Sequence, residues 1–135
     1  MIVTLRIDGT LANLNDYTKA CRTNRFLGAE MKKKMESIVT AHIFQQLQGV
    51  KFDKPVVLSF RWYEPNRKRD LDNISFAKKF VLDALVKNGV LVDDGWEWVQ
   101  GFTDEFFVDR DHPRVEVDIE GIEEYGKGGT QADSK

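Results

Sequence analysis

The sequence has few residues of the types that build cross-linked or nucleophilic sites. It contains one cysteine, Cys21, and two histidines, His42 and His112, among 135 residues. One cysteine excludes an internal disulfide, and no spaced set of Cys and His residues suits a zinc site or a nucleophilic triad. Cys21 lies at helical spacing from Leu14 and Tyr17, so we expect a buried structural thiol. We expect both histidines to be structural as well.

The sequence also lacks a long apolar segment and a glycine-rich phosphate loop. No apolar run approaches the length of a membrane span, and the alternating N-terminal segment MIVTLRIDGT has no apolar core of a signal peptide. We therefore expect a cytoplasmic protein with no membrane partner. A sugar-nucleotide transferase is disfavoured, because the chain is short for separate nucleotide and acceptor halves and has no glycine-rich loop.

The hydrophobic periodicity predicts one α+β domain, which we place at residues 1–122. Its sheet should be small and mixed or mostly antiparallel, with two or three helices. The predicted elements are strand 2–8, helices 13–22 and 29–48 separated by a break at Gly28, strand 55–64, helix 73–87 with Asp72 as its N-cap, and antiparallel strands 97–108 and 114–120. Residues 123–135 are polar and contain several glycines, so we expect a disordered tail.

The net charge of −2 conceals two oppositely charged parts of the chain. Residues 17–92 contain fifteen Lys and Arg but seven Asp and Glu, a net charge of +8, whereas residues 93–125 contain twelve acids and two arginines, a net charge of −10. Because nucleic-acid binding requires a local basic surface, the acidic balance does not exclude it. Solvated helix faces are the alternative explanation. Lys32, Lys33 and Lys34 near a helix start oppose the helix dipole, which favours another use such as phosphate contact.

The segment NRKRDLDN, residues 66–73, places three cations directly before two aspartates. Arg67, Lys68 and Arg69 precede Asp70 and Asp72. Charge pairing and helix capping can account for such a pattern. The other explanation is a metal site that must also attract a polyanion, because the acids would hold the ion while the cations hold neighbouring phosphates.

A second acid pair and a lysine add to this pattern. Asp93 and Asp94 follow the predicted helix, and hard ions such as Mg²⁺ take carboxylate oxygens as ligands, although a tight turn also suits this segment. Lys79 lies seven residues after Asp72, which returns to the same helix face. Lys79 could instead pair with Asp83 four residues later.

These motifs together resemble one nuclease family. RDLDN (69–73), a lysine on the next helix and NGVLVDDG (88–95) resemble the RusA-type Holliday junction resolvases, also called crossover junction endodeoxyribonucleases. The segments RTNRFLGAEMKKK (22–34) and DEFFVDRDHPRVEVDIE (104–120) resemble Firmicute and phage members of that family. The resemblance extends over nearly the whole chain to about residue 120.

The resemblance implies a small homodimer that cuts branched DNA, the four-way junction, with Mg²⁺ or Mn²⁺. The family's acidic triad maps onto Asp70, Asp72 and Asp94, with Asp93 as the alternative. Its catalytic lysine maps onto Lys79, although Lys78 stays possible because the interval between DN and DAL is longer here. The expected DNA-binding residues are Arg67, Lys68, Arg69, Lys32 and Lys33. The alternatives are another metal-dependent nuclease, acting on flaps or duplex, and a non-catalytic nucleic-acid-binding module whose acids are caps and turns.

Overall fold

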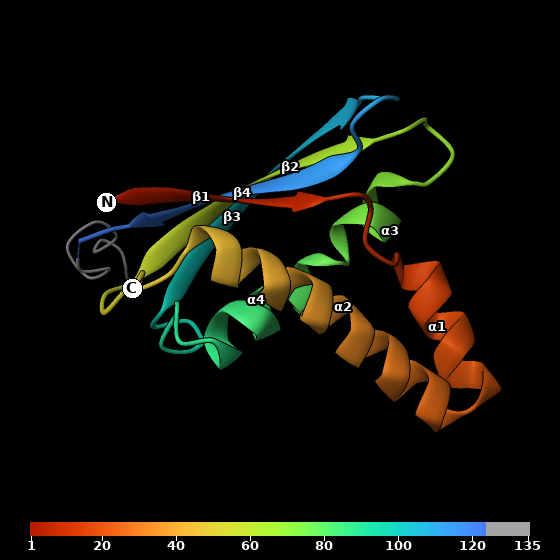
Figure 1. The fold of residues 1–135 in the computed structure, drawn as a ribbon, viewed down its shortest axis with the longest axis horizontal. Helices are drawn as coiled ribbons and strands as arrows, with labels where there is room; N and C mark the ends of the chain where they lie inside the picture. Colours follow the sequence, from red (N-terminus) through yellow and green to blue (C-terminus); the bar gives the residue numbers. More distant parts are fainter. Residues whose placement is uncertain (124–135) are drawn as a thin grey trace, which may run out of the picture.

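A computed structural model of the chain describes residues 1–123. The elements, in chain order, are β1 (Ile2–Asp8), α1 (Leu14–Thr23), α2 (Arg25–Gln46), β2 (Val56–Glu64), α3 (Leu71–Ser75), α4 (Lys78–Lys87), β3 (Val99–Val108) and β4 (Arg114–Gly121). Figure 1 shows three long helices and the short α3 beside one sheet. The predicted α+β class is therefore confirmed. No helix in this part of the chain is both long and apolar enough to cross a bilayer.

The sheet is mixed and has the strand order β1-β4-β2-β3. β4 pairs antiparallel with both β1 and β2, whereas β3 pairs parallel with β2. The predicted antiparallel pair of β3 and β4 is therefore wrong, because β2 lies between them. β2 alternates strictly between buried and half-buried positions, so it is the strand best suited to the centre, while the more exposed β3 forms an edge.

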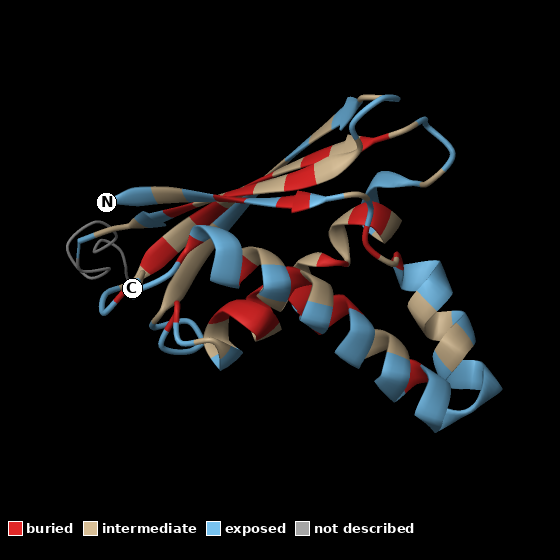
Figure 2. Cartoon of the chain, in the orientation of Figure 1, coloured by how far each residue is buried: buried red, intermediate tan, exposed pale blue. Residues whose placement is uncertain are grey.

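The core lies between the sheet and helices α2 and α4, which cover one face (Figure 1). From β2, Phe60 and Trp62 point into this layer and stack with ring centroids 5.3 Å apart. Val39 of α2 and Phe80 of α4 pack against them as part of the same buried cluster. Figure 2 shows that buried positions gather in the sheet and α4, whereas α1 and the start of α2 are mostly exposed.

The predicted helix at 13–22 is confirmed, but the break that follows it lies elsewhere. Asn13 caps α1 by accepting a hydrogen bond from the Asp16 backbone N–H at 2.8 Å. Asn24, rather than Gly28, separates α1 from α2, because its side chain caps α2 by accepting from the Leu27 N–H at 2.9 Å. Gly28 is a buried residue inside α2 and packs closely against Cys21. Cys21 itself is exposed, so the predicted buried thiol is wrong.

The predicted continuous helix 73–87 is two helices. α3 ends at Ser75, and a turn at Phe76 and Ala77 separates it from α4. Asp70, not Asp72, occupies the N-cap position of α3. Both turn residues face inward, since Ala77 is fully buried and Phe76 packs against the core. Tertiary packing of these two side chains therefore accounts for the interruption, which local helix preference does not reveal.

The predicted disordered tail falls, apart from Glu123, on residues outside the described range. The boundary of the domain at residue 122 therefore stays a prediction.

Candidate nuclease site

The first acid pair lies where β2 leads into α3. Asp70 has extended backbone angles of φ −70° and ψ 152°, and its side chain makes no capping hydrogen bond. The Asp72 carboxylate accepts a hydrogen bond from the backbone N–H of the next residue, Asn73, at 3.0 Å. Both acids are exposed, and neither forms an ion pair within residues 1–123. Their carboxylates are therefore accessible for other partners.

The basic loop beside these acids does not neutralise them. Arg67 and Lys68 are exposed and make no ion pair in the described part of the chain. Arg69 turns away from Asp70 and instead lies 3.4 Å from the Glu64 carboxylate, and it donates a hydrogen bond to the Leu11 carbonyl at 3.0 Å. Simple charge pairing therefore does not explain why these cations and acids are adjacent.

Glu64 is a residue that the sequence reasoning missed. It occupies the last position of β2 on the buried face, and only 6% of its surface is exposed. Burial raises the pKa of the Glu64 carboxyl above its ordinary value, and the charge of Arg69 opposes this only in part. An open hollow of about 710 Å³ is lined by Glu64, Arg67, Arg69 and Asp70 together. An acid at an inward position of an otherwise apolar alternating strand was the available signal.

The second acid pair lies at the other end of the sheet. Asp93 and Asp94 are exposed, and the segment that carries them is fixed by hydrogen bonds from the Phe52 N–H to the Val90 carbonyl and from the Val56 N–H to the Trp98 carbonyl, both 2.9 Å. These contacts lie at the start of β2, whereas Asp70 follows its end.

One chain therefore does not bring the two acid pairs together. β2 has nine residues, which corresponds to a length of about 30 Å. Within residues 1–123 no three His, Cys, Asp or Glu side chains gather closely enough to hold a metal ion. The carboxylate oxygens suit a hard divalent ion, but a complete set of ligands would need carboxylates beyond those that one acid pair supplies.

The two candidate lysines have different surroundings. Lys78 is mostly buried, lies 2.7 Å from the Asp104 carboxylate of β3, and stands 4.6 Å from the centre of the Phe102 ring. Lys79 is 57% exposed and lies 3.4 Å from Asp83. The ion pair between Lys79 and Asp83, which the sequence offered as the alternative to catalysis, is therefore present. The seven-residue spacing of Asp72 and Lys79 does not place them on one helix face, because the helix is interrupted between them.

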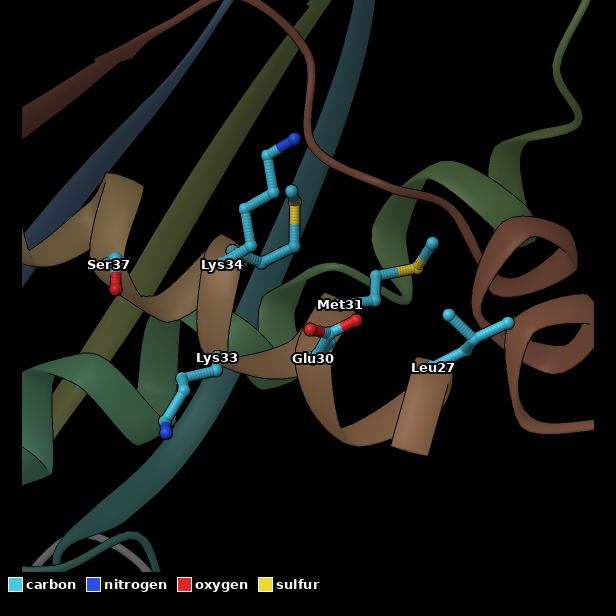
Figure 3. Close-up of a pocket in the computed structure, with 7 residues that line it drawn as sticks. Leu27, Glu30, Met31, Lys33, Lys34 and Ser37 are labelled. Atoms are coloured by element: carbon cyan, nitrogen blue, oxygen red, sulfur yellow. The ribbon is translucent and has the colours of Figure 1, made fainter. Parts of the chain in front are cut away.

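The lysines of α2 are also not equivalent. Lys32 lies 3.5 Å from Asp83 and 3.9 Å from Glu36, so it links α2 to α4. Lys33 and Lys34 are exposed and form no ion pair within the described residues. Figure 3 shows these two side chains leaving the helix in different directions, and both line an open hollow formed by residues of α2. Lys33 is thus freer than Lys32 to contact a polyanion.

Comparison with protein-family models yields a match that covers most of the chain. A protein-family model described as Endodeoxyribonuclease RusA matches residues 11–120, a span that includes both acid pairs and both candidate lysines. A search of curated proteins finds no match.

Proposed function

The chain belongs to the RusA family of crossover junction endodeoxyribonucleases, and we propose that it resolves four-way DNA junctions by paired symmetric nicks during recombination and repair. The observation that supports this proposal most directly is that the candidate metal-binding aspartates are accessible. Asp70, Asp72, Asp93 and Asp94 are exposed and enter no ion pair within residues 1–123, although Arg67 and its neighbour Lys68 lie beside the first two. Charges that do not serve the fold are those that a substrate and a cofactor can use.

The donor set suits Mg²⁺, with Mn²⁺ as a substitute. We propose that Asp70, Asp72 and Asp94 hold the ion, with Asp93 as the alternative to Asp94, because hard cations take carboxylate oxygens. When bound, the ion would activate water for attack on the phosphodiester and stabilise the leaving oxygen. Arg67 and Lys68 would bind the neighbouring phosphates.

Two further residues would complete the chemistry on the protein side. Lys79 would stabilise the negative charge that develops on the scissile phosphate, because its exposed ammonium is held only by a weak pair with Asp83. Arg69, which the sequence predicts to bind DNA, would have a different role. Its contacts with Glu64 and Leu11 fix the loop that presents Asp70, so we propose that it positions the site and also contributes positive potential.

We propose that a second copy of the chain completes the site. β3 is a ten-residue edge strand, and no strand of residues 1–123 pairs with its outer side. Phe102 and Val108 on it are 44% and 51% exposed. An uncovered edge of this length is a ready template for strand pairing.

Antiparallel pairing of two β3 strands about a two-fold axis would have a specific consequence. The start of one β3, which closely follows Asp94, would lie beside the end of the other β3. That end, at Val108, lines the same hollow as Asp70. The arrangement would bring Asp94 of one subunit toward Asp70 and Asp72 of the other, which one chain cannot do.

Four aromatic residues, two just before β3 and two near its end, divide into two groups by exposure. Trp96 and Phe107 are 91% and 41% exposed, so both are accessible to a second subunit. Trp98 and Phe106 are partly buried, and Phe106 packs against the core of its own chain. We therefore propose Trp96 and Phe107 as interface residues.

The decisive experiment is a cleavage assay on a synthetic four-way junction, with linear duplex and flap DNA as controls. Wild type and Asp72→Asn are compared in Mg²⁺ and in EDTA. We expect paired symmetric nicks that require Mg²⁺ and disappear in Asp72→Asn, while junction binding survives because removing an anion near phosphate does not weaken attraction. Asp70→Asn should behave in the same way.

The other outcomes separate the alternatives. Metal-dependent cutting of flaps or duplex in preference to junctions would keep the site and change the substrate. Full cleavage by Asp72→Asn would refute the metal assignment. Folded wild-type protein that binds DNA but cuts nothing with Mg²⁺ or Mn²⁺ would indicate the non-catalytic binding module.

A further inference from the structure

Helix α1 and the first turns of α2 form a projecting arm, defined here as residues 14–34. Figure 1 shows this arm extending away from the sheet on the side of α3. α1 has no buried residue, and Gly28 is the only buried residue of α2 before Met35. The arm therefore contributes little to the core, although it is formed by well-capped helices.

The apex of the arm presents an aromatic side chain to solvent. Phe26 lies in the first turn of α2 and is 75% exposed. Among the large hydrophobic side chains of residues 1–123, only Trp96 is more exposed. Its neighbour Leu27 is 40% exposed, and Figure 3 shows Leu27 pointing toward α1, so Phe26 alone stands free at the tip.

The arm is positively charged around this aromatic residue. It carries six Lys and Arg against two acids. One acid, Asp16, accepts a hydrogen bond from the Asn13 backbone N–H at 3.2 Å as part of the helix cap. Arg22 and Arg25 lie close to Phe26 in the chain and form no ion pair within the described residues. This surface is complementary to a phosphate backbone.

The arm is held in a fixed place relative to the acids of the site. Arg69, the residue before Asp70, donates a hydrogen bond to the Leu11 carbonyl just before α1, at 3.0 Å. Tyr17 of α1 stacks on Phe76, which follows α3, with ring centroids 5.6 Å apart. Two contacts therefore couple the arm to the segment that carries Asp70, so the arm and the acids can engage one DNA molecule together.

From these observations we propose that Phe26 is a wedge that enters the unstacked base step at a DNA branchpoint, while Arg22 and Arg25 bind the flanking phosphates. Proteins that distort DNA insert apolar side chains between bases, and aromatic side chains stack on exposed base faces. A branchpoint offers such faces, and a continuous duplex does not. This inference rests on the proposed function only in taking branched DNA as the substrate.

The test compares Phe26→Ala with Phe44→Ala in the full-length protein. Phe44 is a matched control because it is also an exposed phenylalanine of α2, 61% accessible, near the other end of the helix. Binding is measured in EDTA, so that nothing is cut, with a four-way junction that carries 2-aminopurine at the branchpoint and with linear duplex. Circular dichroism and thermal unfolding verify that both variants fold.

We expect Phe26→Ala to raise the Kd for the junction about tenfold and to remove the fluorescence change of 2-aminopurine on binding. Duplex affinity and the Phe44→Ala protein should match wild type. Phe26→Trp should preserve junction affinity. Arg22→Ala with Arg25→Ala should weaken junction and duplex binding alike and reduce the salt slope by about two.

Three results would overturn the wedge. The first is an unchanged junction Kd and fluorescence response in Phe26→Ala. The second is an equal loss of affinity for junction and duplex in that variant. The third is a changed oligomeric state of Phe26→Ala, which would make Phe26 a contact between subunits. If wild type cuts junctions and Phe26→Ala behaves identically, the wedge fails and the nuclease stands. If wild type cuts no DNA but Phe26→Ala loses junction binding selectively, the nuclease fails and the wedge stands.

Discussion

At the scale of single residues, adjacent cations of the basic loop 67–69 make different contacts. Arg67 and Lys68 are exposed and unpaired within the described residues, whereas Arg69 is committed to Glu64 and the Leu11 carbonyl. Such a division has a physical origin, because a carboxylate and a carbonyl inside the protein stabilise a partly buried guanidinium, whereas exposed cations remain free to bind a ligand.

The same contrast makes a prediction for the two lysines. Lys79→Ala should change the unfolding free energy by about 0.5 kcal/mol or less, because Lys79 is 57% exposed and Asp83 keeps its ion pair with Lys32. The same change should lower cleavage at least about 100-fold if Lys79 stabilises the transition state. Lys78→Ala should cost about 1–3 kcal/mol, because Asp104 would lose its cation.

Thermal unfolding and single-turnover cleavage of both variants measure the two effects. A Lys79→Ala enzyme with wild-type turnover would remove Lys79 from the mechanism. The Asp104 carboxylate would still accept the Trp62 indole N–H at 2.8 Å, so the Lys78→Ala protein should remain folded enough to assay.

At the scale of elements, the hairpin of α1 and α2 depends on one close approach. A Cβ placed at Gly28 would lie 2.5 Å from the Cys21 sulfur and 3.3 Å from the Cys21 Cα. Gly28→Ala should therefore destabilise the protein by about 1–3 kcal/mol through overpacking, and adding Cys21→Ala should restore part of the loss.

Chemical denaturation measures this, with Gly95→Ala as the control, since a Cβ at Gly95 meets nothing within 4 Å. Equal stability of Gly28→Ala and Gly95→Ala would contradict the close packing of the two helices.

The sheet face opposite the helices is held by charges. Arg61 lies 2.7 Å from Asp118 and 3.1 Å from Glu116, and Arg114 lies 2.8 Å from both Glu116 and Asp109. The hydrogen bond from Arg61 lowers the pKa of Asp118 below its ordinary value. Burial would raise the pKa of Glu116, but hydrogen bonds from Arg114 and Arg61 outweigh it, so the net direction is down.

A pH dependence of stability follows from these lowered pKa values. The ion pairs contribute fully above the unfolded pKa values, near 4.5 for Glu116 and 3.8 for Asp118, and are lost as the pH falls through the lower folded values. Unfolding free energy should therefore decline below about pH 4.5. Asp118→Asn should lose about 1 kcal/mol at pH 7 and show a shallower decline. Denaturation curves between pH 3 and 7 measure both, and an equal slope in wild type and variant would contradict this account.

Glu64 should act in the opposite direction. Its raised pKa means that the folded state binds its proton more tightly than the unfolded state does, so its contribution to stability is largest at low pH and declines as the pH rises above about 4.5.

At the scale of the whole molecule, the separation of the two acid pairs makes subunit mixing informative. Asp70→Asn and Asp94→Asn are each expected to be inactive alone. If a site takes Asp70 from one subunit and Asp94 from the other, a mixed dimer contains one site in which both residues are intact. Each mixed dimer then has one intact site of two and should nick one strand. Because random refolding makes about half of the dimers mixed, the mixture should recover about a quarter of the wild-type nicking rate.

The assay is cleavage of a four-way junction after the variants are unfolded and refolded together, with each variant refolded alone as the control. No restored nicking from verified mixed dimers would place both acids in the same subunit and would refute the β3 pairing.

The sequence by itself determined the features that depend on neighbours along the chain. The capped helix α1 and the strand β2 follow from side-chain periodicity and local hydrogen bonds, which act over a few residues. The pattern of basic and acidic residues from Arg67 to Asp72 can likewise be read directly from the sequence. The resemblance to a nuclease family follows from this pattern and the motifs around it. An ion pair such as Lys79 with Asp83 could be anticipated because it spans one helical turn.

Tertiary structure alone decided the features that depend on residues far apart in the sequence. The position of β2 between β3 and β4 depends on which strand buries most surface, so the short link between β3 and β4 misled the sequence-based pairing. Contacts between distant segments also determine three other features. These are the ion pair of Arg69 with Glu64, the interruption before α4 and the separation of Asp70 from Asp94. Burial and strand pairing join segments that no local pattern connects, and their free energy exceeds the weak local preferences on which sequence reasoning relies.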